Sequence, residues 1–258
     1  MSFRGLKVVK RIVGDYRIII AIWLVVGLAI PYTKFFSGRH NNYLIYRNSF
    51  DHLINEQNLY VPYPGEYSDQ FRYGPVFCAL MAPFAVLPEI VGSGLYLLAS
   101  AGFLFLAIQS LPLRKIWRNG FCLIALFDFA NNQEHFQSNA FIAALIILTF
   151  TCVLRDKNIL AAACVALGLF IKLYGIAGIV FLVFSRQKSK FLVSFLCWSV
   201  AFYFSPVVFG SLEFVNESYR DWLSMLLDKN RMNAALGGFQ DQSISGLIRR
   251  LAQTPDIP

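Results

Sequence analysis

Apolar runs of roughly 20 residues recur along this sequence, and that length is what an α-helix needs to cross a bilayer. Hydrophobic residues make up 57% of the 258-residue chain, and its mean hydropathy is +0.53. A soluble domain of this length is less apolar. The pattern predicts an all-α, polytopic transmembrane helical bundle in which residues 1–258 form one membrane-embedded domain.

Hydropathy places the first full-length span at residues 18–36 and the next at 89–111. The run between them, 76–87, is too short to cross upright. Pro83 and Pro88 favour a re-entrant or steeply tilted helix there. Further apolar segments are expected at 120–130, 140–154, 159–171, 173–185 and 191–209. Several are short, and half-helices at membrane depth require protein or a water-filled cavity around their polar groups. The pattern therefore predicts a polar cavity that opens outward.

Clusters of lysine and arginine alternate along the chain with acid-containing segments. The clusters lie before the first span, at 114–118, at 155–157 and at 186–190, and Asp15 and Asp156 are the only acids among them. The positive-inside rule places such clusters in the cytoplasm. Topology thus explains the net charge of +8, which does not indicate a nucleic-acid partner. We expect an integral multi-pass membrane protein with a cytoplasmic N-terminus, an uncleaved signal anchor and an active site that faces the extracytoplasmic side.

All five cysteines lie inside apolar runs. They are Cys78, Cys122, Cys152, Cys164 and Cys197. Because no Cys-x-x-Cys pair or other metal-ligand spacing is present, we expect buried free thiols and no disulfide framework, and no residue is expected to be a metal ligand.

Residues 37–75 form a polar segment that combines ionisable side chains with six tyrosines. Its first part has an apolar face at helical spacing, namely Tyr43, Tyr46, Phe50, Leu53 and Ile54, opposite Arg47, Asn48, Asp51 and Asn55. A helix with this pattern lies in the membrane interface. We interpret 37–75 as an external loop with an interfacial helix at the lip of an active site. A loop that merely caps the bundle is the alternative.

Two carboxylates of this loop are candidates for accepting a proton from a substrate hydroxyl. Asp69 lies shortly before Pro75, where the chain re-enters the membrane, and Arg72 can keep it ionised. Asp51 has Arg47 one helical turn back, so a structural ion pair explains it well. Either acid can also be a solvated loop residue without a role in chemistry.

Lys172 is a lone cation within a long apolar stretch. An ionisable group at membrane depth is a candidate for function, and a lysine suits a phosphate as a point charge. Snorkelling of its side chain to the interface is the alternative. The amide-rich segment 131–139, which includes Gln137 and Asn139, can bind sugar hydroxyls or cap the neighbouring half-helices.

Five motifs resemble those of glycosyltransferase family 87, the membrane mannosyltransferases of the type-C superfamily that use polyprenyl-phosphate mannose. In chain order they are Asn42-Tyr43-Leu44-Ile45-Tyr46 with Gln57-Asn58-Leu59-Tyr60, Phe71-Arg72-Tyr73-Gly74-Pro75 with the run from Met81 to Pro88, Gln137-Ser138-Asn139, Gly168-Leu169-Phe170-Ile171-Lys172, and Gln242-Ser243-Ile244-Ser245-Gly246-Leu247. The likeness covers most of the chain.

The resemblance implies an inverting hexosyltransferase that moves a sugar, with mannose expected, from polyprenyl phosphate to an extracytoplasmic acceptor glycan or glycolipid. The lipid-linked sugar is a donor substrate, so no cofactor is expected, and metal dependence stays open. Lys172 and Arg72 would stabilise the leaving phosphate. Tyr73, Gln137 and Asn139 are the other expected substrate contacts.

The chain departs from the family pattern at two places. Asn42 stands where the family carries its proposed catalytic aspartate, and an amide cannot accept the proton. The base is then expected to be Asp69 first and Asp51 second. Family members are also usually longer. Because no closing span follows the external segment 210–258, we expect a chain truncated at its C-terminus.

Two other function classes stay open. One is a transporter or lipid-flipping protein with a polar cavity, although the halves of the chain show no convincing inverted repeat. The other is a non-catalytic assembly factor that retained the fold and lost the base, as Asn42 allows.

Overall fold

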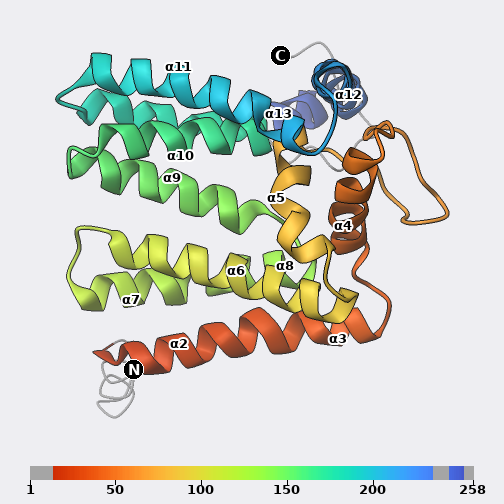
Figure 1. The fold of residues 1–258 in the computed structure, drawn as a ribbon. Helices are drawn as coiled ribbons and strands as arrows, with labels where there is room; N and C mark the ends of the chain where they lie inside the picture. Colours follow the sequence, from red (N-terminus) through yellow and green to blue (C-terminus); the bar gives the residue numbers. More distant parts are fainter. Residues whose placement is uncertain (1–13, 235–243, 253–258) are drawn as a thin grey trace.

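The structure is a computed structural model that describes residues 14–234 and 244–252. Every regular element among these residues is a helix (Figure 1), which confirms the all-α prediction. The basic residues before position 14 and positions 242–243 of the last motif lie outside the described residues.

A stack of helices that run roughly side by side forms the bundle (Figure 1). Its members are α2 (Tyr16–Leu24), η1 (Val25–Ala29), α3 (Ile30–Phe36), α6 (Glu89–Ser110), α7 (Lys115–Ile124), α8 (Leu126–Glu134), α9 (Asn139–Leu154), α10 (Asn158–Ile171), η2 (Leu173–Phe184) and α11 (Lys188–Phe204). Within the described residues, three helices are long and apolar enough to cross a membrane, at Tyr16–Phe36, Glu89–Ser110 and Lys188–Val208. The protein is therefore a membrane protein.

A buried glutamine of α8 joins that helix to η1 and to α6. The Gln133 side-chain amide donates hydrogen bonds to the carbonyl oxygens of Gly27 at 3.3 Å and Leu97 at 2.9 Å. Its side-chain oxygen accepts a hydrogen bond from the Ser100 hydroxyl at 3.0 Å. A buried amide bonded on both ends stabilises one arrangement of its neighbours. The amide thereby sets the position of the turn after α8, which leads into α9.

Three helices lie across one end of the bundle (Figure 1). They are α4 (Asn41–Ile54), α5 (Pro75–Ala85) and α12 (Leu212–Ala234), and α12 follows α11 through the short helix η3 (Ser205–Val208). The other described helix is α13 (Ile244–Ala252). The sequence correctly predicted a short, steeply inclined helix near 76–87 and an amphipathic helix at the start of 37–75.

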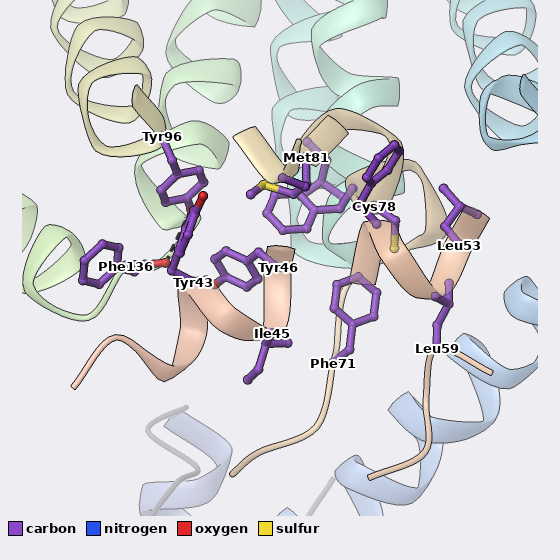
Figure 2. Packing of buried hydrophobic residues seen from close by; sticks show 14 of the residues in the cluster. Tyr43, Ile45, Tyr46, Leu53, Leu59, Phe71, Cys78, Met81, Tyr96 and Phe136 are labelled. Atoms are coloured by element: carbon purple, nitrogen blue, oxygen red, sulfur yellow. Dashed lines mark hydrogen bonds between the residues drawn. The ribbon is translucent and has the colours of Figure 1, made fainter. Parts of the chain in front are cut away.

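Aromatic side chains pack α4 against the bundle. Figure 2 shows Tyr43 and Tyr46 of α4 together with Tyr96 of α6 and with Phe136, which follows α8. All four are buried, as the predicted apolar face of α4 requires. Ile54 departs from that prediction, because it is 46% exposed at the last turn of the helix.

The hairpin of α10 and η2 turns at Lys172, which has an extended backbone with φ −145° and ψ 134°. A Cβ atom at Gly175 would overlap the backbone of Gly168, so the two arms require glycine to approach this closely. The break between the two arms falls at Lys172, between the apolar segments predicted at 159–171 and 173–185.

Gly74 connects the loop to the tip of that hairpin. Its backbone N–H donates to the carbonyl oxygen of Ile171 at 3.1 Å, and a Cβ atom at this position would overlap the carbonyl oxygen of Phe170. Because only glycine fits against this backbone, Gly74 places its neighbour Tyr73 beside Lys172.

The cysteines of the described residues are all free, but the prediction that all five are buried is wrong for Cys197. Cys78 and Cys122 are buried, Cys152 and Cys164 are half-buried, and Cys197 is exposed. Little of the α11 surface is covered by protein, because this helix lies at the edge of the bundle. An apolar helix there contacts lipid, so hydropathy alone cannot distinguish it from a helix buried in protein.

Candidate functional site

The Lys172 ammonium lies among side chains from three separate parts of the chain. Its Nζ donates a hydrogen bond to Asn139 Oδ1 at 2.8 Å, at the start of α9. The same Nζ lies 4.7 Å from the ring centroid of Tyr73 and 5.5 Å from that of Tyr174, both within the range of a cation–π interaction. We call Lys172, Asn139, Tyr73 and Tyr174 the lysine cluster.

Asn139 organises this cluster through both ends of its amide. Its oxygen accepts from Lys172 and also from the Tyr174 hydroxyl at 2.7 Å, and its nitrogen donates to Gln137 Oε1 at 2.8 Å. Among the residues that the structure describes, no carboxylate forms an ion pair with Lys172. An ammonium has three N–H donors, so the half-buried cation keeps capacity for an anionic ligand.

The amide segment 131–139 divides between the two roles considered for it. Asn132 Oδ1 accepts a hydrogen bond from the backbone N–H of Ala140 at 3.1 Å, which satisfies an N–H in the first turn of α9. Asn132 therefore caps α9. Asn139 instead belongs to the lysine cluster, and Gln137 extends this cluster as its hydrogen-bond partner.

Tyr73 and Arg72 are neighbours in sequence but belong to different surroundings. The Tyr73 hydroxyl lies 2.5 Å from that of Tyr46, and its ring stacks on Phe77 at 4.6 Å between centroids, so its place in the lysine cluster is fixed. The Arg72 guanidinium donates to Asp69 Oδ1 at 2.8 Å. Its side chain lines a different cavity, described below.

The two predicted acids differ in their partners. Asp69 pairs with Arg72, and its side chain is 52% exposed. Asp51 is exposed too, but its expected ion pair with Arg47 is absent. Arg47 lies 3.9 Å from Glu89, the first residue of α6, and also donates to the carbonyl oxygen of Ala85 at 3.3 Å. The prediction failed because Arg47 finds partners across the α4–α5–α6 junction.

Asn42 acts as a hydrogen-bond donor. Its side-chain Nδ2 donates to the carbonyl oxygen of His135 at 2.7 Å, which connects α4 to the turn after α8. A carboxylate cannot donate unless it is protonated. The asparagine at this position therefore has a structural role.

An apolar groove of about 600 Å³ runs between α6, α7–α8 and α9. Its lining includes Leu104, Ile108, Leu111, Leu113, Phe121, Phe129, Ala143, Ile147 and Phe150, and its polar residues are Asp128, Asn132 and Asn139. Asn139 is also a member of the lysine cluster. The groove thus extends from the apolar surface of the bundle to Asn139, the hydrogen-bond partner of the cation.

Sequence reasoning missed two residues of this region. Asp128 is an exposed acid that lines the groove. It lies about 9 Å along α8 from Glu134, the last residue of that helix. It could have been found as the lone acid in the apolar run 120–130, because ionisable groups at membrane depth are candidates for function. For Tyr174, the only sign in the sequence of a place in the site was its position two residues after Lys172.

A second, polar groove of about 380 Å³ lies between the loop residues 58–72 and α12. Its polar lining residues are Asn58, Gln70, Arg72, Asp221, Ser224, Asp228 and Lys229, and its other lining residues are Tyr60, Val61, Met225 and Met232. No group of three or more histidine, cysteine or acidic side chains within the described residues forms a metal-binding cluster.

A family model for glycosyltransferase family 87 matches residues 71–257. The chain belongs to glycosyltransferase family 87. It is therefore a glycosyltransferase, as the sequence motifs predicted. No curated protein and no solved structure matches the chain.

The family 87 match includes the lysine cluster, the apolar groove and α12. It begins at Phe71, so Asn42, Asp51 and Asp69 precede it. The family match therefore assigns no role to these three residues, and only their geometry indicates what they do.

Proposed function

We propose that this glycosyltransferase moves a hexose, with mannose as the expected sugar, from polyprenyl phosphate to a glycan or glycolipid acceptor outside the cytoplasm. One observation carries the proposal: the Lys172 cation, without a carboxylate partner among the described residues, lies where the apolar groove meets Asn139. An amphiphilic donor with an apolar chain and a charged phosphate requires both surfaces next to each other.

The apolar groove suits the polyprenyl chain, because burying its hydrocarbon there removes apolar surface from water and from the polar site. Lys172 then lies near the phosphate as a compact point charge. Gln137 and Tyr174 hold Asn139, and Asn139 holds the ammonium, so the cation is oriented before the donor binds.

In the proposed inverting reaction, the acceptor oxygen forms a bond to C1 of the sugar as the bond from C1 to the phosphate oxygen breaks. The electron pair of that bond goes to the phosphate, where Lys172 stabilises the added charge. Arg72, the other phosphate contact expected from the sequence, instead lines the polar groove and pairs with Asp69. A carboxylate takes the acceptor proton. Asp69 is the first candidate for this base and Asp51 the second.

The arrangement of the helices supports a multi-pass topology. The start of α9 and the end of α10, which carry Asn139 and adjoin Lys172, gather with α4 and α12 at one end of the bundle (Figure 1). The basic segments 114–118, 155–157 and 186–190 adjoin the helix ends at the other. By the positive-inside rule, the basic end is cytoplasmic and the lysine cluster faces outward. Cysteines introduced at Asp69 and at Lys188, in a Cys197→Ser background, test this with an impermeant thiol reagent. Labelling at Lys188 from outside intact cells would contradict it.

The function itself is tested with the purified full-length chain in lipid nanodiscs. Radiolabelled polyprenyl-phosphate mannose is supplied together with membrane extract as the source of acceptor, and transfer of label out of the donor is measured. A parallel reaction supplies a radiolabelled nucleotide-mannose. The proposal expects transfer from the lipid donor alone. Transfer from the nucleotide sugar alone, or from neither donor, would overturn it.

A further inference from the structure

The polar groove beside α12 is distinct from the apolar groove that the proposed donor occupies. We infer that it binds the uncharged saccharide part of the acceptor, an inference that deepens the proposed function and rests on it. Its volume of about 380 Å³ falls within the usual range of small-molecule sites, about 300–1,000 Å³.

Charge balance in the groove favours a neutral ligand. Two cations, Arg72 and Lys229, face two acids, Asp221 and Asp228, and Asp69 pairs with Arg72 at 2.8 Å. A site for a phosphate or another polyanion would carry an excess of positive charge. The lining of this groove carries no such excess.

The polar lining suits a ligand rich in hydroxyl groups, each of which both donates and accepts hydrogen bonds. Asn58, Gln70 and Asp221 present amide and carboxylate groups, Ser224 presents a hydroxyl, and Arg72 presents further N–H donors beyond the one on Asp69. Exposed apolar surface on the rim, at Val61 and Met232, complements these polar groups.

Hydrogen bonds hold the walls of the groove in place without a ligand. Asn58 Nδ2 donates to Asp221 Oδ2 at 2.8 Å, and the Trp222 indole donates to the carbonyl oxygen of Arg72 at 3.4 Å, so α12 is joined to the loop at two points. The Tyr60 hydroxyl donates to the carbonyl oxygen of Tyr73 at 2.8 Å. Such a preorganised site loses little entropy when a ligand binds.

The groove also lies next to the lysine cluster. Arg72 lines the groove and Tyr73 contacts Lys172, and consecutive Cα atoms are about 3.8 Å apart. One stretch of chain therefore contributes to both sites, and Asp69, the first candidate for the base, lies on the same stretch and pairs with Arg72.

A cysteine-protection experiment tests the groove without any turnover. Ser224→Cys is made in the full-length chain with Cys197→Ser, and the rate of its modification by a small neutral methanethiosulfonate is measured. Leu223→Cys, an exposed position of α12 outside the groove lining, is the matched control. The probes are methyl α-mannoside, methyl α-glucoside and methyl β-galactoside, and inorganic phosphate.

We expect at least one neutral glycoside to slow modification at position 224 and not at position 223. At about 50 mM sugar and a Kd of about 10 mM, mass action gives a roughly sixfold decrease in rate. Protection by phosphate alone, equal protection at both positions, or no protection by any probe would overturn the inference.

A second measurement separates this inference from the proposed function. Ser224→Trp fills the groove, and Leu223→Trp is its control. We expect Ser224→Trp to reduce transfer to membrane acceptors by about tenfold or more, as loss of a substrate site does, while cross-linking of a photoreactive polyprenyl-phosphate probe is unchanged. If the parent protein itself is not cross-linked by the donor probe, the proposed function is contradicted. If Ser224→Trp keeps full transfer activity, the inference that the polar groove binds the acceptor is contradicted.

Discussion

Lys172 donates a 2.8 Å hydrogen bond to the side-chain oxygen of Asn139, and the two residues are separated by 33 positions in sequence. The contact joins the hinge of the α10–η2 hairpin to the first turn of α9. It holds a cation beside Asn139, which lines the apolar groove, and the prediction about donor binding follows from it.

Replacing Lys172 tests the proposed phosphate contact. Lys172→Met removes a charge-assisted contact of about 1.5–3 kcal/mol, so turnover of the lipid donor should fall about ten- to a hundredfold. Lys172→Arg keeps the charge and should retain more activity. Lys188→Met, at the first residue of α11, is the control, and its activity should be unaffected. Equal activity in all three variants would remove Lys172 from the site.

The two neighbouring asparagines at the start of α4 test whether Asn42 is structural. Asn42 donates to the carbonyl oxygen of His135, whereas Asn41 Oδ1 accepts from the backbone N–H of Ser68 at 2.8 Å. An aspartate can accept but cannot donate. Asn42→Asp should therefore lower stability by about 1–3 kcal/mol and create no activity, and Asn41→Asp should be tolerated. Thermal unfolding in detergent measures the first effect.

A gain of transfer in Asn42→Asp would give the opposite answer. The chain would then be a catalytically silent relative in which this position retained its place beside the substrate.

The identity of the base is tested with the two candidate acids. Asp69→Asn keeps the shape of the side chain and its contact with the Gln70 backbone N–H, but it cannot accept a proton. Transfer should fall by about a hundredfold or more, with expression and donor cross-linking intact. Asp51→Asn should be milder, since Asp51 lies on the exposed face of α4. Full activity in Asp69→Asn would place the base elsewhere.

His52 gives the loop a pH-dependent stability. Burial lowers the pKa of His52 below its ordinary value of 6.5, although the Glu66 carboxylate at 3.0 Å opposes this. Because the folded-state pKa is lower than the unfolded one, protons bind more tightly to the unfolded chain. Stability should be complete above about pH 6.5 and should decrease as the pH falls below it.

The measurement is the thermal unfolding midpoint in detergent between about pH 7 and pH 5, a window around the ordinary histidine pKa. The unfolding midpoint of His52→Asn should decrease less over this pH range than that of the parent protein. His135→Asn, at an exposed histidine, should follow the parent. If His52→Asn and the parent show the same pH dependence, the buried histidine is not its source.

Local patterns in the sequence were sufficient for much of the fold. The apolar runs predicted the spans, the spacing of Tyr43, Tyr46 and Phe50 predicted α4, and the short run at 76–87 predicted the inclined α5. The family followed from the motifs as well. All of these depend on neighbours within a few positions, because hydropathy and helical periodicity are properties of a short segment.

The tertiary structure decided which side chains meet across the chain. Arg47 pairs with Glu89 instead of Asp51, Asn42 donates to His135, and Asn139 holds Lys172. Each contact joins residues on different elements, and a one-dimensional pattern does not contain the geometry of helix packing. A side chain within reach of several partners takes the one that packing brings to it, so the sequence by itself determined the helices and the family, and only the packed bundle determined the site.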